Sequence, residues 1–211
     1  MRWMLTVLTA AAMSAAAAMP PPDFPEELLA EPTVKLRPVG ALSLGALEVR
    51  FEETTLAQAK LAAGTGSIGE RGHAGGHILW LCYAVPQHSR FDRLWLISSG
   101  EMGGNEHRIT QIAAVRSAGM KPMNDCPELP EKLQPVSLST GLWLGTDVRH
   151  LTATLGPPSR HVGDWMSYLY VGKKAAFNVT CSGGWDVMNW LVTRSSDGMI
   201  SAIHAGQVAS C

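Results

Sequence analysis

The sequence predicts an α+β fold made of two tandem repeats, each a helix packed on an antiparallel β-sheet. Residues 55–64 (TLAQAKLAAG) align without gaps on residues 147–156 (DVRHLTATLG). In both places a glycine-containing loop follows, then an aromatic strand, and then a further apolar strand that carries a tryptophan. Elements that recur in the same order and spacing are the signature of a duplicated unit.

The first repeat begins with residues 42–51, which alternate in polarity as a half-buried strand does. Thr54 or Thr55 can cap a helix that runs to about Ala63, and Gly64 stops it. Three β-type runs separated by turn-forming residues then predict a meander, at residues 77–85, 93–99 and 108–116.

The second repeat has the same order of elements. A strand is expected at 136–144, and Thr146 or Asp147 can cap a helix over 147–155 that ends at Gly156. Further strands are expected at residues 165–171, 176–181, 187–193 and 199–205.

The first 18 residues predict a cleavable signal peptide. Arg2 precedes an apolar run, and the sequence Ala16-Ala17-Ala18 fits the small-x-small rule for cleavage. The run is too short and too rich in alanine for a membrane anchor. We therefore expect a soluble protein in a bacterial periplasm or outside the cell.

The remaining chain divides by composition. Residues 19–40 form a proline-rich leader that we expect to be extended, with no stable structure of its own. The other segments are the first repeat at 41–117, a proline-containing connector at 118–135, and the second repeat at 136–211.

The charge balance excludes polyanionic partners. The chain has 17 basic and 18 acidic residues, and loss of Arg2 with the signal peptide leaves 16 basic ones. A net charge near −2 provides no electrostatic footprint for nucleic acid or for anionic lipid.

Four cysteines in an exported chain indicate two disulfides. Three pairings are possible. The repeat favours Cys82–Cys126 and Cys181–Cys211, each of which joins a strand of one copy to the tail behind its last strand. No CxxC or CxxH spacing points to a metal cluster instead.

Several strands are apolar on both faces, which an antiparallel sheet covered by one helix does not need. In residues 93–97, Leu94 and Leu96 lie on one face while Trp95 and Ile97 lie on the other. We expect something else to cover the second face: the other repeat, the leader, or a separate protein.

A helix that ends in Leu155-Gly156-Pro157-Pro158, followed by a turn and the aromatic strand 164–168, resembles the repeat of the β-lactamase inhibitory proteins. It is also similar to the BamE/SmpA outer-membrane assembly lipoproteins. The resemblance implies a tandem fold whose concave aromatic sheet holds a target enzyme. The chain departs from both families, because it lacks a lipid-anchoring cysteine and its cysteines are not spaced for short bridges within a repeat.

The resemblance also implies which residues touch a partner. The tryptophans of the strands would form the gripping surface, and the turn over 99–104 would probe the target. The candidates are Trp80, Trp95, Trp165 and Trp190 for the surface, Glu101 and Met102 for the turn, and Tyr168 of the aromatic strand. Alternatively, Trp95 and Trp190, at equivalent positions of the two repeats, are paired core residues, and Trp80 and Trp165 face outward.

No catalytic or metal-binding set is convincing. His73 and His77 have i, i+4 spacing, but glycines flank and separate them, so no helix fixes their geometry. Glu101, Glu106 and His107 share a glycine-rich turn and could do acid–base chemistry, although turn charges are usually solvated. We expect no enzyme, no cofactor and no metal.

The sequence therefore predicts an exported protein-binding module, of the inhibitor or immunity type. A cell-envelope assembly or structural accessory protein of the BamE kind is the alternative. An enzyme that uses the Glu101/His107 turn is a third hypothesis.

Overall fold

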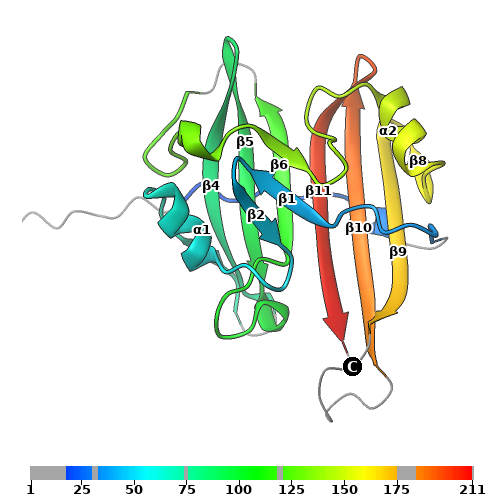
Figure 1. Ribbon diagram of the computed structural model, residues 1–211, viewed down its shortest axis with the longest axis horizontal. Helices are drawn as coiled ribbons and strands as arrows, with labels where there is room; N and C mark the ends of the chain where they lie inside the picture. The colour runs from blue at the N-terminus through cyan, green and yellow to red at the C-terminus, as the bar shows by residue number, and fades with distance from the viewer. Residues whose placement is uncertain (1–17, 30–32, 74–75, 118–120, 175–183, 211) are drawn as a thin grey trace, which may run out of the picture.

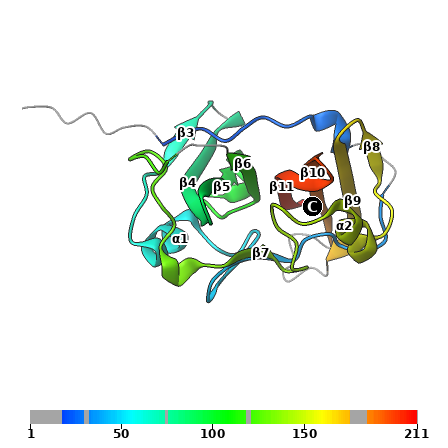
Figure 2. The same cartoon turned by 90° about the horizontal axis from the view of Figure 1, so that it is seen from above.

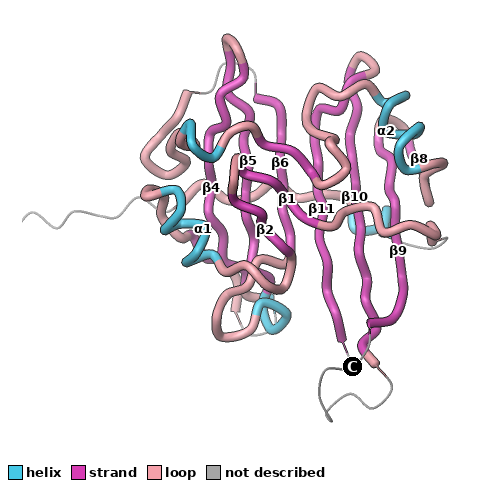
Figure 3. Tube along the Cα trace, in the orientation of Figure 1, coloured by secondary structure: helices cyan, strands magenta, loops and turns pink. Residues whose placement is uncertain are grey.

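The computed structural model describes residues 18–29, 33–73, 76–117, 121–174 and 184–210, and these residues form a mostly β structure. Strands account for 48% and helices for 15%. Figure 3 shows the two kinds of element, with strands running the height of the molecule and short helices at its flanks.

Eight antiparallel strands form a large sheet. Their order across the sheet is β3 (Gly69–Arg71), β4 (Ile78–Gln87), β5 (Arg90–Ser99), β6 (Gln111–Ser117), β11 (Met199–Ser210), β10 (Trp185–Ser196), β9 (Trp165–Lys174) and β8 (Arg160–Val162). A small sheet of three antiparallel strands lies across one face of it, in the order β2 (Leu47–Arg50), β1 (Ala41–Leu44) and β7 (Val136–Leu138) (Figure 1).

Both predicted helices are confirmed, as α1 (Leu56–Ala63) and α2 (Val148–Leu155). Thr55 and Gln58 form a capping box at the start of α1, because each side chain bonds the backbone N–H of the other. Gly64 ends this helix in the left-handed conformation. These signals are local, so the sequence reveals them.

The predicted fold class is wrong, because the structure is not two helix-on-sheet repeats. Strand β6 pairs with β11 from Ala202↔Val115 to Gly206↔Gln111, and this seam makes one continuous sheet of both halves. Each α-helix has only eight residues. A helix of about two turns covers little of a sheet, so the small sheet supplies the rest of the second layer.

The main core lies between the small and large sheets. We call the side of the large sheet that faces it the core face; Leu81, Leu96 and Leu191 lie on it. The small sheet contributes Leu42, Leu44 and Val49 to the same core, and the helices contribute Leu56 and Leu151. All these side chains are at most 1% exposed.

Other predicted strands need correction. Residues 42–51 form the hairpin β1–β2, which turns at Gly45 with φ +55°, in place of one strand. The strand expected at 136–144 ends at Leu138, and β3 and β8 were not predicted. The strand expected at 176–181 lies outside the described residues.

The leader is packed against the large sheet on the side opposite the small sheet (Figure 2). We call residues 19–29 the strap; its last part, Glu26–Leu29, is a 3₁₀ helix. Beyond the strap, Val34 donates a hydrogen bond to the carbonyl of Leu169, and Val39 pairs with the buried side chain of Asn189. The leader thus passes from one face of the sheet to the other.

Candidate functional site

The four candidate tryptophans lie on the face of the large sheet that the strap crosses, which we call the strap face. Trp80 and Trp95 belong to one apolar cluster there, and Trp165 and Trp190 belong to another. Alternation along a strand explains this placement, because residue 81 next to Trp80 belongs to the core face. The structure therefore places the four candidate tryptophans on one face of the large sheet.

In the first half of the sheet, the tryptophans are covered. Trp80 and Trp95 are each 3% exposed and pack with Cys82, Cys126 and Ala18. The indole N–H of Trp95 donates to the carbonyl of Met19 at 2.9 Å. The beginning of the strap thus seals this end of the face.

The disulfide Cys82–Cys126 holds part of that cover in place. It joins β4 to the connector across 44 residues, and it confirms one of the two predicted disulfides. Cys181 and Cys211, the other predicted pair, lie outside the described residues. A disulfide of this kind indicates a location outside the cytoplasm.

In the second half, Trp190 is 3% exposed and packs with Leu28 of the strap and with Leu169. Trp165 is only half-buried. The guanidinium carbon of Arg194 lies 5.7 Å from the centre of its ring, within cation–π range. Trp165 is therefore the candidate tryptophan with the most accessible ring.

Two of the tryptophans lie flat along the sheet because their cross-strand partner is glycine. A Cβ at Gly69 would come within 2.5 Å of the Trp80 ring, and one at Gly206 within 2.5 Å of the Trp190 ring. Both glycines are directly opposite the tryptophan in the register. Because the two rings lie flat, they form a shallow apolar surface against which the strap packs.

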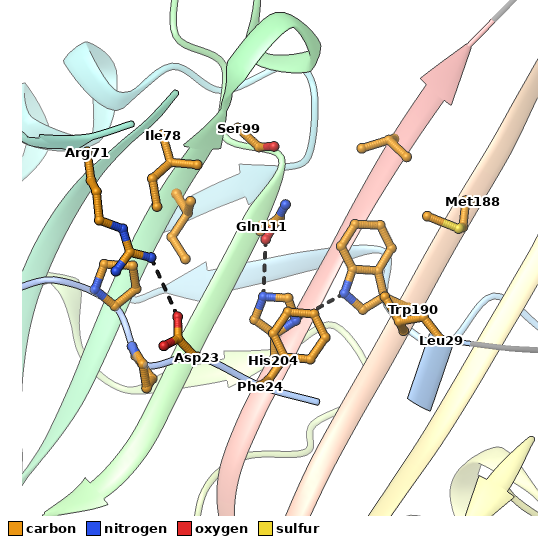
Figure 4. Close-up of a pocket in the computed structure, with 14 residues that line it drawn as sticks. Asp23, Phe24, Leu29, Arg71, Ile78, Ser99, Gln111, Met188, Trp190 and His204 are labelled. Carbon is orange, nitrogen blue, oxygen red and sulfur yellow. Dashed lines mark hydrogen bonds and ion pairs between the residues drawn. The ribbon is translucent and has the colours of Figure 1, made fainter. Parts of the chain in front are cut away.

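His204 of β11 lies at the centre of the strap face, and its protonation state follows from its partners (Figure 4). The Trp190 indole N–H donates to Nδ1 at 3.2 Å, so Nδ1 carries the lone pair. The proton therefore sits on Nε2, which lies 3.1 Å from Oε1 of Gln111. Burial lowers the pKa of His204 to about 3, so the ring is neutral at physiological pH.

Phe24 of the strap stacks on His204, with ring centres 3.6 Å apart and planes 20° from parallel. Beside this stack a cavity of about 750 Å³ separates strap from sheet. Apolar side chains, including Ile78, Ile97 and Met188, line it together with the polar Ser99. Figure 4 shows Ile78, Ser99 and Met188 among the side chains that line this space.

Three predicted site residues lie elsewhere. Tyr168 is on the core face, fully buried, with its hydroxyl 3.4 Å from the carbonyl of Gly156, and burial raises its pKa. Met102 is exposed in the 3₁₀ turn Gly100–Gly103 and belongs to neither apolar cluster of the strap face. Glu101 lies in the same turn, and its side chain is outside what the structure describes.

The residues considered for catalysis do not form a set. Glu106 binds Arg108 at 2.7 Å, and His107 is exposed with a left-handed backbone. His77 lies 3.6 Å from Glu70, an exposed carboxylate on β3. Within the described ranges, no three metal-ligating side chains come together.

Sequence reasoning missed Phe24, Arg71, Gln111 and His204. The available signal was the leader itself, which was one of three covers considered for the doubly apolar strands. Nothing in the pattern around His204 distinguishes it from other strand histidines. Its partners come from β6, β10 and the strap, so only the folded chain assembles them.

Comparisons with family models, with curated proteins and with solved structures found no match. The function therefore has to be argued from the site alone. Among the residues whose structure is described, no helix has the length and apolar character that a membrane crossing requires.

Proposed function

We propose that this is an exported binding protein that holds a partner protein against its strap face, in the manner of an inhibitor or immunity protein. One observation carries the proposal. Four tryptophans from four different strands lie on a single face of one continuous sheet, outside the main core. Tryptophan is among the residues most enriched at the centres of protein interfaces.

The cover of this face supports the proposal because it is a chain segment and not a layer of the fold. The strap touches the sheet through side chains and a few hydrogen bonds. If it moved away, the two apolar clusters of this face would meet water, and exposed apolar patches mark sites of protein interaction. Trp165, already half-exposed, lies at the rim where a partner could first make contact.

The proposed place of action is the periplasm or the extracellular space. Residues 1–18 read as a signal peptide, and the Cys82–Cys126 disulfide needs an oxidising compartment. The small net charge favours a protein partner over a nucleic acid or a charged membrane. An envelope assembly role of the BamE type is the alternative function for the same face.

A comparison of four baits tests the proposal. Each is the oxidised chain from Met19 onward, incubated with periplasmic and secreted proteins and quantified by mass spectrometry. The first bait is the wild type, and the second is Phe24→Ala, which weakens the strap. The third adds Met188→Glu to this change and places a charge on the strap face. The fourth adds Leu61→Glu instead, at a site 83% exposed on α1, as the matched control.

We expect one protein to be enriched by Phe24→Ala, lost with Met188→Glu, and kept with Leu61→Glu. Recovery at a one-to-one ratio of a soluble enzyme supports the inhibitor role. Recovery of outer-membrane proteins with the same pattern supports the assembly role. Equal capture by the Met188→Glu and Leu61→Glu baits would mean that the strap face is not the binding surface.

A further inference from the structure

The strap has the properties of a peptide ligand. Four of its seven residues from 19 to 25 are prolines, which have no N–H to donate and favour an extended backbone. A few direct hydrogen bonds hold its backbone at the two ends. Met19 donates to the carbonyl of Asp125, Trp95 donates to Met19, and Arg160 donates to the carbonyl of Glu27. Proline-rich segments bind aromatic grooves in this way, through side chains on a preformed backbone.

The strap face contacts three side chains of the strap separately. Phe24 stacks on the fixed ring of His204. Asp23, the residue before it, lies 3.5 Å from the guanidinium of Arg71 on β3. Leu28 is only 2% exposed and packs against Leu169 and Trp190. These contacts recognise an acidic residue, the aromatic residue next to it, and an aliphatic residue four positions after the aromatic one. Pro21 and Pro22, directly before them, line the cavity.

The strap does not fill the space beneath it. The cavity of about 750 Å³ lies between Phe24 and the apolar side chains of β4, β5 and β10. That volume falls in the range of ordinary ligand pockets. A segment with bulkier side chains would therefore bury more surface here than the strap does.

We infer that the strap occupies the binding groove in place of a partner's segment, and that the groove binds in trans an extended Pro-Pro-acidic-aromatic segment of another protein. This inference rests on the proposed function and names the chemistry of the partner. The strap competes with that segment from within the same chain. A tethered competitor acts at an effective concentration in the millimolar range, so it suppresses weak ligands and admits tight ones.

A labelled peptide with the strap's own sequence, residues 19–29 (MPPPDFPEELL), tests the inference by fluorescence anisotropy. The receptors are the full oxidised chain from Met19, as wild type and as Phe24→Ala. Loss of a stacked aromatic from the tethered strap releases the groove, so we expect about tenfold tighter peptide binding to Phe24→Ala. The matched peptide with alanine in place of Phe24 is expected to bind neither receptor well.

Charge exchange between Arg71 and Asp23 provides a second measurement, made on the Phe24→Ala receptor. Arg71→Glu in the Phe24→Ala background is expected to lower the affinity for the peptide a few-fold. A peptide with lysine in place of Asp23 is expected to recover that affinity. Far-ultraviolet circular dichroism establishes that each receptor is folded.

Equal affinity of the two peptides for a folded Phe24→Ala receptor, or no binding of either, would overturn the inference. The outcome is separable from that of the proposed function. Peptide binding without capture of any envelope protein supports the groove and removes the protein-binding role. Capture of a partner without peptide binding keeps that role and removes this groove as its basis.

Discussion

At the scale of single residues, His204 determines the chemistry of the strap face. Both ring nitrogens have partners, in Trp190 and Gln111, and Phe24 covers one face of the ring. A ring this buried can neither bind a metal nor exchange a proton without disturbing the strap. It serves as a flat, neutral surface for stacking.

The buried neutral His204 should make stability depend on pH. Its folded pKa of about 3 is below the usual 6.5, so as the pH falls the unfolded chain takes up the proton first. The contribution of the neutral His204 to the free energy of unfolding is complete above about pH 6.5. It is lost progressively down to pH 3, at up to about 1.4 kcal/mol per pH unit.

Urea denaturation between pH 7.5 and 4.5 checks this dependence, with His204→Gln as the comparison. Asp23 and Arg71 line the same cavity and are present in both proteins. The difference in pH dependence between the wild type and His204→Gln therefore reports the histidine alone. We expect the free energy of unfolding to fall more steeply with acid in the wild type. Parallel curves would show that His204 is not held neutral.

The glycine under Trp190 should resist substitution. In Gly206→Ala the new Cβ would meet the Trp190 ring at 2.5 Å and the carbonyl of Thr110 at 2.7 Å. Overpacking of this kind costs about 1–3 kcal/mol. The control is Gly76→Ala, where a Cβ meets nothing within 4 Å. Thermal unfolding should separate the two variants, and near-ultraviolet circular dichroism should report a displaced indole only in the first.

Residue-scale prediction from the sequence succeeded where alternation alone decides. Alternation predicts Trp95 and Ile97 on the face opposite Leu94 and Leu96, and the structure places these side chains in that way. Tyr168 was assigned to the same surface as Trp165, although three positions along a strand put two side chains on opposite faces. That error was avoidable from the sequence. The covering of Trp80, Trp95 and Trp190 was not, because it depends on where the leader lies.

At the scale of elements, the strap and the connector depend on each other. Asp125 accepts the backbone hydrogen bond of Met19, and the neighbouring Cys126 is tied to β4. The disulfide therefore fixes the loop on which the strap begins. Releasing it should loosen the cover over Trp80 and Trp95.

Replacing both Cys82 and Cys126 by serine should reduce stability by about 4 kcal/mol, from the entropy of a loop closed across 44 residues. Tryptophan fluorescence of the folded variant should shift to longer wavelength as water reaches Trp80 and Trp95. Phe24→Ala, which loosens the strap without touching the disulfide, separates the two effects. A loss below about 1 kcal/mol with unchanged fluorescence would show that the connector holds its place unaided.

Elements were predictable from the sequence when their signals are local. The capping box at Thr55 and the stop at Gly156 mark the two helices within a few residues. The small sheet has no such signal, since Leu42 pairs with Leu138, which is nearly half the chain away. The same holds for the seam between β6 and β11. Pairing over such separations is decided by packing of the whole core, so a linear pattern of two repeats missed it.

At the scale of the whole molecule, the structure is one unit. A single cluster of buried side chains joins Leu81 and Tyr83 of the first half to Tyr168 and Leu191 of the second. The small sheet links both halves again, because β1 pairs with β2 before the first helix and with β7 before the second. The function proposed for the strap face depends on this continuity, since the strap spans both halves.

A shared core requires both halves to unfold together. Hydrogen exchange should give amides of β4 and β10 the same free energy of opening, equal to that of global unfolding. The seam variant Ile203→Ala removes a side chain that is 2% exposed, at a cost of about 2–5 kcal/mol. Because the seam belongs to both halves, we expect protection to fall equally in the two strands. Loss confined to β10 would mean that β8–β11 form an independent unit, and that a partner could separate the halves instead of displacing the strap.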